Sequence, residues 1–174
     1  MMREETATSA SQHRPAPHEA AADKANQRSW LLCRAGSVLC ALPIEQVLEI
    51  MRLLPIEPMA GAPKYVRGLS IVRGAPVPVV DLGVVIGDRT IESTRLITVR
   101  VATRTIALAV EAVLGITAVA SSAFGQLPPL LRDAASDTVT AIGALDSELI
   151  VFLRAARLVP DDVFARVHAE AAAP

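Results

Sequence analysis

Short apolar runs recur along most of this 174-residue chain, and turn-forming residues separate them. The runs are five to seven residues long and rich in β-branched side chains, as is typical of strands in a sandwich or barrel. They cover residues 30–34, 38–42, 53–57, 68–73, 75–81, 95–101, 105–110, 113–119, 140–145 and 148–153. Ten strands within about 130 residues fit two small five-stranded barrels better than one large closed barrel. We therefore predict an all-β fold of two such barrels side by side.

Residues 65–82, with the sequence YVRGLSIVRGAPVPVVDL, contain two Arg-Gly pairs. Gly68 and Gly74 are predicted to lie where the chain turns or bulges, because only glycine takes a positive φ without steric cost. Each pair therefore places an arginine next to a turn or a bulge.

Two prolines, Pro76 and Pro78, interrupt the second half of this motif. Proline cannot donate a hydrogen bond to a sheet, so residues 75–82 are predicted to form an edge strand or a strand with one protected side. An apolar strand edge flanked by Arg67 and Arg73 is a natural docking surface. The motif favours a binding module over an enzyme.

Helices are predicted to be few and short. Pro43 is expected to open a helix over IEQVLEIM at 44–51, and a turn is expected at 63–66. An Ala-rich helix is predicted to begin at the Pro-Asp-Asp sequence of residues 160–162. Residues 125–137, which include two prolines, are expected to form a surface loop.

The chain is expected to divide into a tail, a domain and a C-terminal segment. Residues 1–28 are polar, Ala-rich and Pro-containing, and they cannot bury enough apolar area to offset the entropy of ordering. We expect a disordered tail at 1–28, a domain at 29–160 and a C-terminal helix or tail at 161–174. The tail lacks the basic and then apolar pattern of a secretory signal, so we expect a cytoplasmic protein.

Composition argues against nucleic acid and membrane as partners. The net charge is −1 and aromatic residues make up 3% of the chain, which leaves little for phosphate attraction or base stacking. The apolar segment 105–124 is long enough to span a bilayer, but it carries Glu111 near its middle. Split at Glu111 and Gly115, it gives two runs of strand length. We expect no direct membrane insertion.

The two cysteines, Cys33 and Cys40, are predicted to lie on antiparallel neighbours joined by a tight turn at Gly36-Ser37. Reduced thiols in the core are the expected state of such a pair in a cytoplasmic protein. The chain has no histidine between residues 30 and 160, so the sequence predicts no metal site and no histidine-based catalysis.

Four sequence blocks in a fixed order resemble the CheW-like coupling domain of bacterial chemotaxis. They are VLEI at 47–50, PKYVRGLSIVRGAPVPVVDL at 63–82, RTIALAVEAVLGI at 104–116, and AIGAL at 141–145 followed by ELIVFL at 148–153. The resemblance runs from about Trp30 to Val159, and it implies two SH3-like barrels with no catalytic activity and no cofactor. It further implies a scaffold that joins the cytoplasmic tip of a methyl-accepting chemoreceptor to the regulatory domain of a CheA-type histidine kinase.

The resemblance also implies a partner-binding surface. Carried over position by position, that surface comprises Val47, Glu49, Gly68, Arg73, Gly74 and Ile116. Glu49 and Arg73 are expected to pair, and the pair would fix the loop that presents the arginine. Simpler roles stay open: the glycines as turn residues, the arginines as solvated charges, and Val47 and Ile116 as core. The chain departs from the family pattern at Ile71, where an asparagine is common.

Two other functions are compatible with the sequence. The segment VVDLG at 79–83 faintly resembles the Asp-Thr/Ser-Gly turn of aspartic hydrolases, but Leu82 follows Asp81 where that chemistry needs a small hydroxyl residue. Asp81 is instead expected to cap a short helix that starts at Leu82. The second alternative is a generic SH3-like interaction module outside chemosensing.

Overall fold

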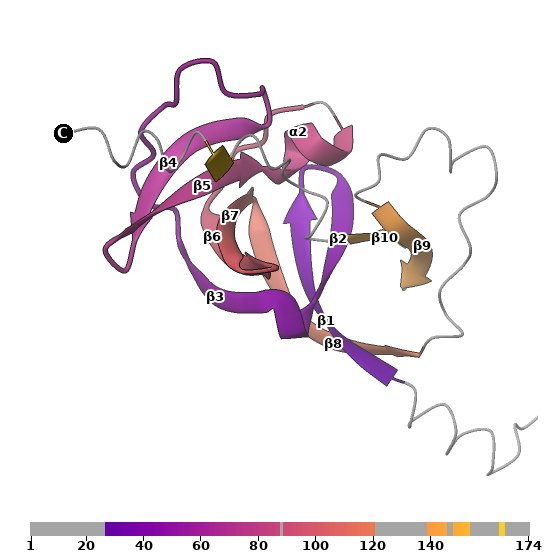
Figure 1. Ribbon diagram of the computed structural model, residues 1–174. Coiled ribbons are helices and arrows are strands. Elements are labelled where there is room, and N and C mark those ends of the chain that lie inside the picture. Colours follow the sequence, from indigo (N-terminus) through magenta and orange to yellow (C-terminus); the bar gives the residue numbers. More distant parts are fainter. Residues whose placement is uncertain (1–26, 88, 121–138, 146–147, 154–163, 166–174) are drawn as a thin grey trace, which may run out of the picture.

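The computed structural model describes residues 27–87, 89–120, 139–145, 148–153 and 164–165. Within them, the strands form two five-stranded sheets (Figure 1), which we call sheet A and sheet B. Sheet A has the order β8-β1-β2-β10-β9 and comprises β1 (Gln27–Ala35), β2 (Val38–Pro43), β8 (Ala112–Ala120), β9 (Val139–Leu145) and β10 (Glu148–Leu153). Sheet B has the order β3-β6-β7-β5-β4 and comprises β3 (Val47–Arg52), β4 (Val66–Val72), β5 (Ala75–Asp81), β6 (Arg95–Val101) and β7 (Arg104–Val110). The predicted all-β fold of two SH3-like barrels is confirmed.

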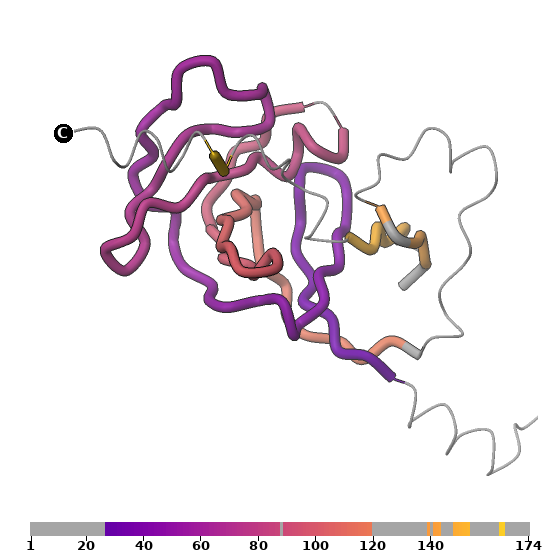
Figure 2. Tube along the Cα trace, viewed as in Figure 1, coloured from indigo at the N-terminus to yellow at the C-terminus, as the bar shows by residue number. Residues whose placement is uncertain are grey.

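The chain builds sheet A from both of its ends and sheet B from its middle. It enters sheet A through β1 and β2, forms all of sheet B with β3 to β7, and returns to sheet A with β8 to β10. The trace in Figure 2 shows this path, in which the indigo and orange segments lie together beside the magenta ones. Each sheet contains one parallel pair, β2 with β10 and β5 with β7.

The two sheets share one hydrophobic core. Leu31 and Leu42 of sheet A belong to the same buried cluster as Ile97 and Leu108 of sheet B. Two smaller clusters lie within single sheets, one around Trp30 and Phe152 in sheet A and the other around residues such as Val79 in sheet B. Because the main cluster draws on both sheets, the barrels are expected to unfold together.

Strand β3 replaces the helix predicted at 44–51. The chain makes a single 3-10 turn, η1 (Ile44–Gln46), and then continues as β3, which pairs with β6. The helix prediction was therefore wrong beyond its first turn.

The strand predicted at 53–57 exists only as an isolated bridge. In it, Glu57 and Leu69 exchange two backbone hydrogen bonds of 2.8 Å. The bridge joins β4, one edge of sheet B, to the chain that leaves β3, the other edge. This contact closes sheet B on itself as a barrel.

Strand β5 is not the edge strand that its prolines suggested, since it lies between β7 and β4. However, β7 pairs only with Val79, Val80 and Asp81 at the end of β5. Both prolines fall in the first half, 75–78, which pairs with β4 alone. The alternative prediction, a strand with one protected side, describes this half.

Local features around β5 agree with the sequence. The turn at 63–66 is closed by a hydrogen bond of 2.8 Å from the amide of Val66 to the carbonyl oxygen of Pro63. Helix α2 (Leu82–Gly87) follows β5, and its Val84 amide donates to Asp81 Oδ1 at 3.2 Å, as the predicted cap requires.

The ends of the chain are described only in part. Strand β1 begins at Gln27, inside the segment predicted as a tail, and residues 1–26 lie outside the described residues. Only Phe164 and Ala165 of the predicted C-terminal helix are described, so that helix is not confirmed, and the loop predicted at 125–137 also lies outside. Among the described residues, no helix has the length and apolar character needed to cross a bilayer.

Candidate functional site

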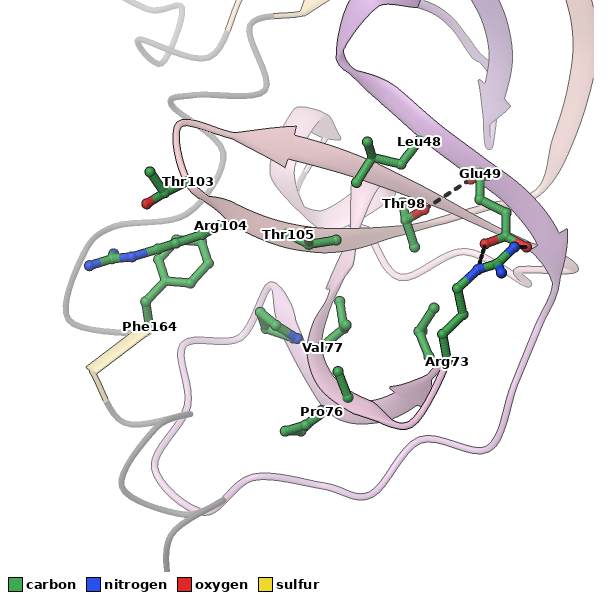
Figure 3. Close-up of a pocket in the computed structure, with 13 residues that line it drawn as sticks. Leu48, Glu49, Arg73, Pro76, Val77, Thr98, Thr103, Arg104, Thr105 and Phe164 are labelled. Carbon is green, nitrogen blue, oxygen red and sulfur yellow. Dashed lines mark hydrogen bonds and ion pairs between the residues drawn. The ribbon is translucent and has the colours of Figure 1, made fainter.

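Glu49 and Arg73 form a bidentate ion pair on sheet B. Arg73 Nε donates to Glu49 Oε2 at 2.7 Å, and Nη2 donates to Oε1 at 3.0 Å (Figure 3). Glu49 lies on β3, and Arg73 lies in the turn between β4 and β5, so the pair ties two distant parts of the sheet together. The pairing expected from the sequence is confirmed.

A β-bulge at Leu48 aims Glu49 at its partner. Val47 pairs with Val99 of β6, but Glu49 pairs with Thr98, so Leu48 is an extra residue in β3. In a regular strand, residues 47 and 49 would face the same side. Because of the bulge, Val47 packs against the shared core, whereas Glu49 and Thr98 line a surface groove. Sequence alternation alone gives no sign of this change.

Arg73 has a backbone conformation that is uncommon for arginine. Its φ is 50° and that of Gly74 is 82°, so both central residues of the two-residue turn have positive φ. This is the pattern of a type I′ hairpin, in which asparagine and glycine are preferred. The side chain of Arg73 is 79% exposed and that of Glu49 is 35% exposed. The turn therefore holds a strained arginine at the surface.

Electrostatics at the pair favour both charged forms. The hydrogen bonds from Arg73, aided by its charge, hold the pKa of the Glu49 carboxyl below its ordinary value. The same hydrogen bonds and the carboxylate charge raise the pKa of the Arg73 guanidinium. Since an exposed ion pair contributes little to stability, its main effect is on geometry, namely the direction of Arg73.

A groove with a volume of about 540 Å³ runs beside this ion pair. In Figure 3, Glu49 and Arg73 stand at one end of the groove, and Arg104 and Phe164 stand at the other. Its lining is mainly apolar. It comprises Leu48, Val72, Ala75, Pro76, Val77 and Pro78, together with Thr98, Thr103 and Thr105. Such a groove accommodates an apolar side chain of another molecule.

The two predicted glycines have different surroundings. Gly68 has φ 143°, and a side chain there would collide with the backbone of Glu57 and Pro58. A side chain at Gly74 would meet no atom within 4 Å. Gly68 is thus required by close packing, whereas Gly74 serves the turn.

The structure does not bring all six predicted surface residues together. Val47 is half-buried against the shared core, so the core alternative holds for its side chain. Ile116 is 64% exposed, which excludes the core alternative, but it lies on β8 of sheet A. Glu49, Arg73 and Gly74 form one group on sheet B. Leu48, Arg104 and Phe164 also line the groove, but they were not predicted as site residues.

Arg67 and Asp81 form a second, more buried ion pair. Arg67 Nε lies 3.3 Å from Asp81 Oδ2, and the side chain of Asp81 is 2% exposed. Arg67 is also the extra residue of a bulge in β4. Its role as a merely solvated charge is therefore excluded. Asp81 Oδ1 accepts a hydrogen bond from the Val84 amide, whereas the buried Oδ2 lies in ion-pair range of Arg67 but accepts no hydrogen bond. This carboxylate is therefore occupied by a helix cap and an ion pair, and neither feature supports the hydrolase alternative.

Cys33 and Cys40 face each other across β1 and β2, and both are buried free thiols, as predicted. The neighbouring Cys40 thiol and the burial of the site raise the pKa of Cys33. The described part of the chain contains no group of three His, Cys, Asp or Glu side chains that could hold a metal ion.

Known proteins share the sequence pattern and the fold of this chain. The family model of the CheW-like domain matches residues 29–163. The chain belongs to the CheW-like domain family. Among solved structures, this CheW-like domain is similar to the scaffolding protein TtCheW from Thermoanaerobacter tengcongensis. The TM-score is 0.65 at 21% identity, over 74% of this chain and 89% of that one, so the likeness supports the fold alone.

Curated relatives of the CheW-like domain cover most of its length. It is 29% identical over 138 residues to the chemotaxis protein CheW of Rhizobium meliloti strain 1021, which covers 78% of this chain and 89% of that protein. It is 22% identical over 143 residues to the chemotaxis protein CheW of Klebsiella aerogenes, with 80% and 86% covered. These CheW-like relatives are therefore matched over nearly their whole length.

Proposed function

We propose that this protein is a non-enzymatic coupling scaffold of a chemosensory pathway. It joins the cytoplasmic tip of a methyl-accepting chemoreceptor to the regulatory domain of a CheA-type histidine kinase. The observation that carries the proposal is the family match over residues 29–163. The relatives named chemotaxis protein CheW, which the chain matches over nearly their full length, support it. Two packed barrels with an exposed groove suit a protein that binds two partners.

The proposed binding surface is centred on Arg73. Its guanidinium is fixed by Glu49 but remains exposed at the end of an apolar groove. A planar guanidinium held in one orientation gives directional hydrogen bonds, and the groove gives apolar contact. Gly68 and Gly74 shape the hairpin that carries it, and Val47 anchors the strand that carries Glu49. Ile116 adds a separate apolar contact on sheet A.

A binding experiment with two partners tests this function. The purified full-length chain is titrated against the kinase regulatory domain and, separately, against a chemoreceptor cytoplasmic fragment from the same genome. Wild type is expected to bind both, and Arg73→Glu is expected to weaken at least one of them by about tenfold or more. Arg100→Glu is the matched control, because Arg100 is also an exposed arginine of sheet B, on β6, but does not line the groove. Binding of neither partner by wild type would overturn the proposal.

The proposal also places the protein in the cytoplasm, at receptor arrays beneath the inner membrane. Modest pairwise affinities are sufficient there, because many linked contacts in an array raise the effective concentration of each site. A fluorescent fusion is expected to gather with receptor clusters in wild-type cells and to spread through the cytoplasm in cells that lack the receptors. Uniform fluorescence in both strains would contradict this placement.

A further inference from the structure

The end of the groove farthest from Arg73 is formed by a residue from beyond the last strand. Strand β10 ends at Leu153 in sheet A, yet Phe164 lies against Arg104 at the start of β7 in sheet B. The Arg104 guanidinium carbon is 4.6 Å from the centre of the Phe164 ring. Phe164 and Arg104 face the groove together (Figure 3). Phe164, which follows sheet A in the sequence, therefore completes a surface of sheet B.

Phe164 is a firmly held residue. Its side chain is 4% exposed, and it belongs to the same buried cluster as Val101 and Ile106 of sheet B. Burial of a whole aromatic ring is strongly favourable, and the contact with Arg104 adds to it. A side chain held in this way acts as a fixed wall, because its departure would expose the ring to water.

The groove exists because sheet B is split at this place. The parallel pairing between β5 and β7 begins only at Val79 and Ala107. Before that point, Pro76 and Pro78 have no amide N–H to donate, which disfavours pairing of this half of β5 with β7. Residues 75–78 and 103–105 line the two sides of the resulting gap, and Phe164 lies at its end. The ring therefore closes one end of the gap, beside Arg104.

The groove specifies the chemistry of its occupant. Its lining is mostly apolar, which fits an aliphatic or aromatic side chain. At the near end, Glu49 uses the Nε and Nη2 donors of Arg73, and an arginine has further N–H groups for an acceptor. The side chain of Arg73 is 79% exposed, so those groups can be reached. An apolar side chain with a carboxylate beside it complements both features.

We propose that Phe164 is a positioning residue for partner binding, which holds the groove open for an apolar side chain of the partner whose neighbouring carboxylate binds Arg73. The inference rests on the proposed function and adds Phe164 to the proposed binding surface. It implies that Phe164 and Arg73 serve the same partner, although they stand at opposite ends of the groove.

Affinity measurements with both partners test the inference. Arg73→Glu is expected to lower the affinity for one partner. Phe164→Ala in the full-length chain is expected to lower the affinity for that same partner by about tenfold and to change the affinity for the other partner by less than about threefold. Phe164→Leu keeps most of the apolar volume, so this variant is expected to bind with an affinity within about threefold of wild type. The double variant with Arg73→Glu is expected to lose less than the product of the single losses, because both act on one contact.

Controls separate positioning from general damage. Ala165→Ser changes the neighbouring exposed residue and is expected to leave both affinities unchanged. If Phe164→Ala does not fold, Phe164→Leu is compared with Arg104→Gln, which removes the cation above the ring and is expected to weaken the same partner by about threefold.

The possible outcomes are distinct. Stronger binding by Phe164→Ala would overturn the inference in favour of a segment that blocks the groove. Unchanged affinities, or equal losses of affinity for both partners, would also overturn the inference while leaving the proposed function in place. Failure of wild type to bind either partner would overturn the proposed function and this inference together.

Discussion

The backbone of Gly68 passes so close to Glu57 that no side chain fits between them. A Cβ at position 68 would meet the carbonyl group of Glu57 and would lie 2.9 Å from Pro58 Cα. At this place, the Glu57–Leu69 bridge closes sheet B. The glycine is therefore a requirement of barrel closure, and any surface role that it has is a consequence of that closure.

Replacing Gly68 by alanine is expected to destabilise the protein by about 2–3 kcal/mol, because the added methyl group must push the 57–58 backbone away and opposes the positive φ. Urea unfolding measures the loss. Gly74→Ala is the matched control, since a side chain there meets nothing within 4 Å. It is expected to cost about 1 kcal/mol from its positive φ alone. Equal losses for the two variants would contradict the role of close packing.

The buried ion pair of Arg67 and Asp81 predicts an asymmetry between its two partners. Arg67→Leu leaves a carboxylate with 2% exposure and no cation, which is expected to cost about 3 kcal/mol or more. Asp81→Asn leaves an arginine with 25% exposure that can reach water, and it is expected to cost about 2 kcal/mol. Denaturant unfolding of both variants checks the order. The asparagine side chain keeps an oxygen that can cap α2, so a larger loss for Asp81→Asn would contradict the expected cost of leaving the buried carboxylate without its cation.

How far the sequence predicts this fold depends on the range of the interactions involved. Turn glycines and the Asp81 cap are local and were predicted correctly. Strand β3 was missed because Ile44, Val47, Leu48 and Met51 have the spacing of one face of a helix. Pairing with β6 overrides that local pattern.

The candidate site was likewise predicted only in part. The pairing of Glu49 with Arg73 followed from the family resemblance, but the Leu48 bulge that makes it possible depends on the register with β6. Phe164 at the end of the groove could not be predicted, because its place depends on packing between a C-terminal residue and the start of β7. Composition and periodicity carry no information about such contacts.

The buried thiols of Cys33 and Cys40 are expected to be unreactive in the folded protein. Their side chains are inaccessible, and the raised pKa of Cys33 keeps that thiol protonated, whereas the thiolate is the reactive form. A thiol reagent such as Ellman's reagent is expected to label neither cysteine at pH 7.5 in buffer and both in denaturant. Rapid labelling of the native protein would indicate that β1 and β2 open easily.

The lowered pKa of Glu49 predicts the pH range in which its ion pair exists. A carboxyl whose pKa is lower in the folded protein than in the unfolded chain stabilises the fold above the unfolded value, about 4.3, and this effect is lost as the pH falls through the folded value. Glu49→Gln is therefore expected to lower the Tm by only about 1–2 °C at pH 7, because the pair is exposed. The difference from wild type is expected to be smaller at pH 3 than at pH 7. Thermal unfolding at both pH values measures it, and a difference that grows in acid would contradict the assignment.

The positive φ of Arg73 predicts that stability and binding will change in opposite directions. Arg73→Asn gives the turn an Asn-Gly sequence, which suits a type I′ hairpin better than Arg-Gly. We expect the Tm to rise by about 2 °C even though the ion pair to Glu49 is lost. We also expect partner affinity to fall by about tenfold, since the guanidinium is gone.

A second hairpin provides the control for this prediction. Ala102, between β6 and β7, has φ 53°, so Ala102→Asn relieves a similar strain without removing a binding group. It is expected to raise the Tm by a similar amount and to leave both affinities unchanged. If Arg73→Asn bound both partners as wild type does, the strained arginine would have no function in binding. If instead Arg73→Asn lowered the Tm, the ion pair would be worth more to the fold than the relief of turn strain, and its role would be structural.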